Sequence, residues 1–186
     1  MRPKNLFSMA MIIIVATACR IVSTLPPPHC PIEDLLLDES VFPEDFFQTL
    51  PSKDGAPIRF GIDKIGVGFG STTQPGGVGQ DVYLGRSTKE AQREFIDWAK
   101  WEFSPREGWT EWYTPESFNY QSSTADQYRF ACYKHIASGV ETCQAIGQYG
   151  PYLIRFHTNL STILTYQDLE RMLQAIDEKA ARCLEE

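Results

Sequence analysis

Two stretches of the chain place apolar residues at helical spacing and predict amphipathic helices. The first helix begins with a capping box of Ser87 and Glu90 and ends at the Ser104-Pro105 pair. Its apolar stripe consists of Ala91, Phe95, Trp98, Ala99 and Phe103. The second helix is capped by Thr165 and Asp168. Its apolar face consists of Leu169, Met172, Leu173, Ile176, Ala180 and Cys183.

Most of the remaining chain alternates apolar and polar residues, which is typical of β-strands. The predicted strands cover residues 56–71, 82–86, 108–114 and 125–135, and a hairpin over 142–159 turns near Tyr149 and Gly150. Residues 72–81 are rich in glycine around Pro75 and predict a loop. Residues 33–47 predict a short helix or strand laid against the body, with a turn at Pro43.

This order of elements predicts an α+β fold. Two amphipathic helices must bury their stripes, and a twisted antiparallel β-sheet is the layer available to them. The prediction is a single domain over residues 32–186. The order resembles that of the PsbP-like group of secreted domains and of small extracytoplasmic sensor domains, although it carries no functional residue across.

The first residues predict export from the cytoplasm. A basic start is followed by a short apolar run, too short to cross a membrane, which predicts a signal peptide over residues 1–18. The stretch Ala16-Thr17-Ala18-Cys19 resembles a bacterial lipobox, although Ala16 stands where Leu is usual. The resemblance implies cleavage before Cys19 and a lipid on its thiol. The proline-rich residues 19–31 then form a tether to the membrane.

Residues 148–159 and 165–184 resemble the ends of uncharacterised bacterial lipoproteins, with no implied activity. The alternative is an ordinary signal, which leaves the protein secreted and free.

Four further cysteines remain after Cys19, an even number in an oxidising compartment. Four thiols allow three pairings, but the strands on either side of residues 137–139 place Cys132 opposite Cys143. Cys30 would then pair with Cys183, which lies on the apolar face of the second helix.

The net charge of the chain limits the classes of partner that it can bind. The net charge of −7 becomes about −9 without Arg2 and Lys4, so we expect no nucleic-acid partner. Acidic residues gather before residue 50 without the spacing of an EF-hand, and we interpret them as a solvated collar. They are Glu33, Asp34, Asp38, Glu39, Glu44 and Asp45.

No motif predicts a cofactor, a metal or a catalytic group. The glycines of residues 66–70 lack the following helix of a dinucleotide site. The residues His29, His135 and His157 lack metal-ligand spacing, and no G-x-S-x-G elbow is present.

The least ordinary stretch holds all four tryptophans within residues 98–112. Exposed aromatic rings offer flat surfaces to sugars or apolar ligands. The candidate ligand-binding residues are Trp101, Trp109, Trp112, Arg106 and Arg129. Alternatively, these aromatic residues only seal the helix onto the sheet.

The sequence therefore predicts a lipid-anchored extracytoplasmic domain that binds a small molecule or a protein and has no enzymatic activity. The alternatives are a secreted hydrolase with a dispersed site near the tryptophans and a structural envelope protein.

Overall fold

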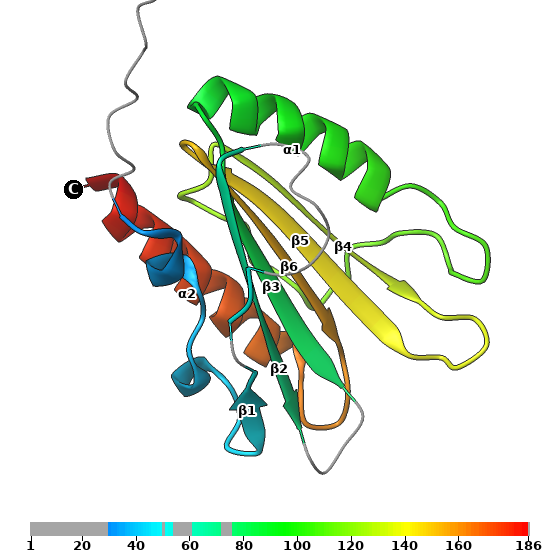
Figure 1. Ribbon diagram of the computed structural model, residues 1–186. Coiled ribbons are helices and arrows are strands. Elements are labelled where there is room, and N and C mark those ends of the chain that lie inside the picture. Colours follow the sequence, from blue (N-terminus) through cyan, green and yellow to red (C-terminus); the bar gives the residue numbers. More distant parts are fainter. Residues whose placement is uncertain (1–29, 50, 54–60, 72–75, 186) are drawn as a thin grey trace, which may run out of the picture.

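A computed structural model describes residues 30–49, 51–53, 61–71 and 76–185. The fold is built on one antiparallel sheet of six strands in the order β1-β2-β3-β6-β5-β4 (Figure 1). The strands are β1 Phe46–Gln48, β2 Asp63–Ser71, β3 Gly77–Leu84, β4 Gln127–Lys134, β5 Glu141–Tyr149 and β6 Tyr152–Asn159. The mixed α and β composition agrees with the predicted class.

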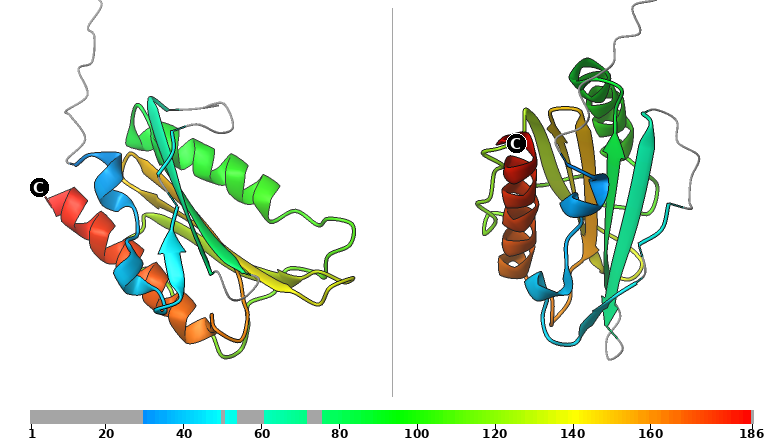
Figure 2. Two further views of the ribbon diagram at one scale, coloured as in Figure 1. Left: turned by 60° about the horizontal axis from the view of Figure 1, so that its bottom comes forward. Right: turned by 60° about the vertical axis from the view of Figure 1, so that its left-hand side comes forward.

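The two predicted helices form and cover opposite faces of the sheet (Figure 2). Helix α1 spans Thr88–Glu102, and the Ser87 hydroxyl accepts from the Glu90 backbone N–H at 3.1 Å. Helix α2 spans Tyr166–Glu185, and Asp168 accepts from the backbone N–H of Thr165 at 2.9 Å. Alternate residues of each strand face the two helices, because successive side chains of a strand point to opposite sides.

The larger core lies on the α2 side. It joins the apolar face of α2 to inward positions of the strands, such as Val82 and Ile154. Two short 3-10 turns, η1 Ile32–Leu35 and η2 Glu39–Val41, lie along α2 at the margin of this core (Figure 1). The buried amide of Gln80 on β3 accepts from the Leu37 backbone N–H at 2.7 Å. The same amide donates to the Leu35 carbonyl at 2.9 Å and so fixes the N-terminal segment to the sheet.

Both disulfides lie in this core. Cys132 and Cys143 are direct partners across β4 and β5, with Cα atoms 4.0 Å apart. Cys30 is bonded to Cys183 near the end of α2, with a Cα separation of 5.3 Å. Strand geometry favours the first pair, and the second is the pair that then remains; it joins the start of the described chain to its last helix.

Strand β3 begins earlier than the sequence predicts. Residues 77–81 belong to the predicted loop, yet they pair with β2 and, from Val78 onward, with β6. The glycines that indicated a loop alternate with Val78 and Gln80, which are buried on the α2 side. A central strand with glycine on one face therefore resembles a loop in sequence. Residues 54–60 and 72–75 lie outside the described residues.

The strand predicted over 108–114 is also wrong. This segment runs along the edge of β4 and makes only two isolated bridges, Trp109 to His135 and Tyr113 to Cys132. Between the two bridges, this segment advances by four residues while β4 and the residue after it advance by three, so the register slips by one. A continuous ladder needs one register, and the slip interrupts it.

Candidate functional site

Three of the predicted ligand-binding residues form a row at the C-terminal end of α1. The guanidinium carbon of Arg106 lies 5.0 Å from the ring centroid of Trp101 and 4.5 Å from that of Trp109. Both distances fall in the range of cation–π attraction. The side chain of Trp101 is nevertheless 61% exposed. The row of Trp101, Arg106 and Trp109, called here the aromatic row, is therefore ordered by its own contacts while one ring stays open to solvent.

The aromatic row rests on the sheet through Trp109. Its ring stacks on Tyr133 of β4, with centroids 3.8 Å apart and planes 9° apart. Trp112 packs edge-on against Tyr133 and Phe103, and its indole N–H donates to the Ser104 carbonyl at 3.1 Å. The structure thus uses Trp112 to hold the segment after α1 against the sheet.

Arg129 lies apart from the aromatic row. Its guanidinium sits 4.5 Å from the ring centroid of Phe103 and donates to the carbonyl of Ala99 at 3.4 Å. A cation near the last carbonyls of a helix is favourable because the helix dipole is negative there. The sequence placed Arg129 and Arg106 in one candidate site, whereas the structure sets them on different aromatic partners.

A charged cluster that the sequence did not predict lies beside α1. Arg155 of β6 forms ion pairs with Asp81 of β3, at 3.4 Å, and with Glu102 of α1. Its guanidinium also stacks on Trp98, 4.3 Å from the ring centroid. Lys64 of β2 completes the cluster, 3.6 Å from Asp81. Glu102 also pairs with Arg106 of the aromatic row at 3.7 Å, so three cations share the two carboxylates.

Burial shapes this cluster. Lys64 and Glu102 are each 7% exposed, which is rare for charged side chains unless they are paired. Burial opposes the charge of Arg155, but the Glu102 carboxylate and the Tyr83 hydroxyl together outweigh that effect and raise the pKa of Arg155 above its ordinary value. Removing one partner from a buried cluster of paired charges lowers stability, because it leaves a buried charge without compensation. The one available sequence signal is the charge of Arg155 within an apolar strand, because Asp81 belongs to the predicted loop.

Glycines occupy the same face of the sheet at β2 and β3. Gly68 pairs with Gly79, and Gly70 pairs with Gly77, so no side chain rises from these positions. The imidazole of His157 on β6 fills part of the space, since a Cβ at Gly79 would lie 2.2 Å from the ring. The glycines of residues 66–70 are therefore strand positions. The outer edge of His157 is exposed, while packing against the sheet and the nearby Arg155 lower its pKa.

A buried carboxylate marks the opposite side of the sheet. Asp177 of α2 accepts hydrogen bonds from the hydroxyls of Tyr149 and Ser122, each at 2.8 Å, and from the Ser123 backbone N–H at 3.2 Å. Burial, together with this carboxylate, raises the pKa of Tyr149 well above its ordinary value. Ser122 and Ser123 tie the segment before β4 to the last helix, and Tyr149 ties β5 to it.

A pocket of about 540 Å³ opens between η1, the last turns of α2 and the β1–β2 edge. This volume is within the range of ligand pockets in proteins. Its charged residues are Glu33, Asp34 and Asp38 from the N-terminal segment and Lys179 and Arg182 from α2. Three acids of the predicted solvated collar therefore meet cations from the far end of the chain, a proximity that no local pattern could indicate.

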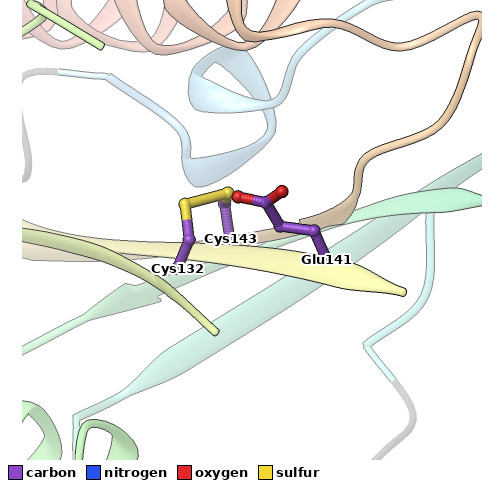
Figure 3. Close-up of side chains that lie close together, drawn as sticks. All are labelled: Cys132, Glu141 and Cys143. Atoms are coloured by element: carbon purple, nitrogen blue, oxygen red, sulfur yellow. A yellow bond between two sulfur atoms is a disulfide. The ribbon is translucent and has the colours of Figure 1, made fainter. Parts of the chain in front are cut away.

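Glu141 lies next to the bonded sulfur atoms of Cys132 and Cys143 (Figure 3). Sulfur atoms in a disulfide offer no thiolate to a metal ion. The carboxylate of Glu141 is already occupied, because the hydroxyls of Tyr113, at 2.6 Å, and of Tyr166 donate to it. We therefore assign a structural role to this group.

The predicted signal peptide and lipidation site lie outside the residues that the structure describes. Cys19, the signal segment and His29 all precede residue 30. Among the helices that the structure describes, none combines the length and apolar character needed to cross a membrane.

Comparison with solved structures finds a similar fold. The extracellular domain of PknH from Mycobacterium tuberculosis superposes with a TM-score of 0.59 over 83% of this chain and 95% of that domain. The sequences are 14% identical, so the likeness shows the fold alone. No protein-family model matches the chain. No curated protein sequence matches it either.

Proposed function

We propose that the chain is an extracytoplasmic binding or interaction domain, without enzymatic activity, that is held at the membrane by a lipid on Cys19. The signal-like first residues, the two disulfides and the fold shared with an extracellular domain support the location. The lipobox-like residues 16–19 support the anchor.

The aromatic row carries the binding part of the proposal. A tryptophan held in a fixed position and 61% exposed stabilises little in the fold, yet it offers a large flat surface to a ligand or a partner. Aromatic and arginine side chains are the ones most enriched where binding energy concentrates.

The test compares two exposed residues of the same helix. Ile96 is 57% exposed on another side of α1 and serves as the control for Trp101. We expect native mass spectrometry of the protein from the envelope fraction to show a bound molecule that is lost in Trp101→Ala and kept in Ile96→Ala. Both variants should unfold within about 0.5 kcal/mol of the parent. A bound molecule retained equally by both variants would contradict the role of the aromatic row.

The anchor needs its own experiment. In Cys19→Ala, we expect the protein to leave the membrane fraction, because the thiol that carries the lipid is gone. Unchanged membrane retention of this variant would contradict lipidation without bearing on ligand binding.

A further inference from the structure

The pocket beside the Cys30–Cys183 disulfide carries a second inference, independent of the aromatic row. Its walls come from two segments far apart in the chain, the η1 region and the end of α2, which lie side by side in Figures 1 and 2. The disulfide joins these walls directly. A covalent link between the walls fixes the shape of the pocket before a ligand arrives, which reduces the entropy lost on binding.

The base of the pocket is apolar. Leu36, Leu37 and Ile65 line it, and all three are buried in the core of the α2 side. An aliphatic group placed on this base would leave water and gain the usual hydrophobic stabilisation. The ligand should therefore carry an aliphatic part.

The rim is charged, and most of its charges are matched within the protein. Asp38 pairs with Lys179 at 3.5 Å, and Glu33 pairs with Lys53 at 3.2 Å. Within the described part of the chain, the carboxylate of Asp34 and the guanidinium of Arg182 form no ion pair. One acid and one base therefore remain to meet a ligand.

These features together define the ligand. A simple anion would satisfy Arg182 alone, and a simple cation would satisfy Asp34 alone. We propose that the pocket binds a small zwitterion of the amino acid or dipeptide class, with its ammonium group at Asp34, its carboxylate at Arg182 and its aliphatic part on the leucines. Such a ligand would pair with both Asp34 and Arg182 and would also contact the apolar base of the pocket.

The probe that tests this proposal is the dipeptide L-alanyl-L-leucine, titrated calorimetrically into the purified, oxidised full-length protein. Its N-acetyl derivative keeps the carboxylate and loses the ammonium group, and its C-terminal amide does the reverse. We expect saturable binding of the dipeptide and at least tenfold weaker binding of each derivative, because each loses one charge-assisted hydrogen bond. Absence of saturable dipeptide binding, or equal affinity for all three compounds, would overturn the proposal.

Variants assign the two ends. Arg182→Gln should weaken the dipeptide at least tenfold and leave the amide unchanged. Asp34→Asn should weaken the dipeptide and leave the N-acetyl derivative unchanged. The matched control is Arg93→Gln, which removes a cation exposed on α1, far from the pocket lining.

Thermal unfolding of each variant separates misfolding from lost contacts, since all three changes are at exposed positions and should leave the melting temperature unchanged. Trp101→Ala should bind the dipeptide as the parent does, so this proposal and the one for the aromatic row fail separately. If Arg182→Gln and Asp34→Asn bind the dipeptide like Arg93→Gln, the assignment of the pocket is overturned.

Discussion

The two faces of the sheet stabilise their buried charges in different ways. On the α2 side, the carboxylate of Asp177 is surrounded by neutral hydroxyl and amide donors within a large apolar core. On the α1 side, Arg155 is balanced by the carboxylates of Asp81 and Glu102 in a smaller core. Both disulfides lie on the α2 side. The α2 side therefore holds most of the apolar core and both disulfides, whereas the α1 side has a smaller core and the exposed Trp101.

The largest loss of stability should follow removal of the disulfides on the α2 side. Replacing both Cys30 and Cys183 by Ala removes a link across 153 residues and should lower the free energy of unfolding by about 5 kcal/mol on the loop-entropy model. Replacing Cys132 and Cys143 by Ala removes a link across 11 residues and should cost about 3 kcal/mol. Urea denaturation measures both values. The reverse order would show that strain or packing, and not loop length, governs these bonds.

The next largest loss of stability should follow substitution of Asp177, the buried carboxylate of the α2 side. Asp177→Ala leaves the Tyr149 hydroxyl and two further donors without a partner and should cost about 3 kcal/mol of unfolding free energy. The neighbouring Glu178→Ala is the control, because Glu178 is exposed and should change stability by less than about 0.5 kcal/mol. Equal losses in the two variants, measured by urea denaturation, would contradict the role given to the hydroxyl donors.

Substitutions in the charged cluster of the α1 side should lower the free energy of unfolding by less. Glu102→Gln keeps the shape of the side chain but leaves Arg155 with one carboxylate, and should cost about 2 kcal/mol because the cluster is only partly closed to water. Glu107→Gln, an exposed change after the same helix, is the matched control. A thermal shift no larger than that of the control would show that water already screens the cluster.

The smallest expected effect is the contribution of His157 to the pH dependence of stability. Its pKa in the folded protein lies below the ordinary value of 6.5, so the unfolded chain binds the proton more readily. Stability should therefore fall as the pH drops from 6.5 through the folded pKa, and should be flat in this respect above 6.5. In His157→Gln this part of the decline should disappear. In His135→Gln it should persist, and stability measured between pH 7 and 5 distinguishes the two.

Local patterns predicted the elements whose signals lie close together in the chain. The caps of both helices, the apolar face of α2 and the hairpin turn at Gly150 all follow from residues within one element. The pairing of Cys132 with Cys143 is local as well, because the two cysteines flank one short turn. These features need no knowledge of the strand order.

The features that sequence could not predict depend on that order. Strand β3 lies beside β6, some 70 residues further along, and only this neighbour brings Asp81 to Arg155. Strand β2 and helix α1 then contribute Lys64 and Glu102. The pocket likewise joins Asp34 to Arg182 from the two ends of the domain. Glycine-rich β3 was misread because glycine indicates a loop in one context and a close-packed strand face in another.

The bond between Cys30 and Cys183 also determines how the domain bears mechanical load. Tension that reaches Cys30 along the chain from its N-terminal side passes through the sulfur atoms straight into the end of α2. The chain between the two cysteines, which are 153 positions apart, cannot extend while that bond is intact. If the domain is attached to the membrane by a lipid, a force at the attachment point would act on the end of α2 and not on the sheet. Reduction of the disulfide would transfer that force to the rest of the domain and allow it to unfold.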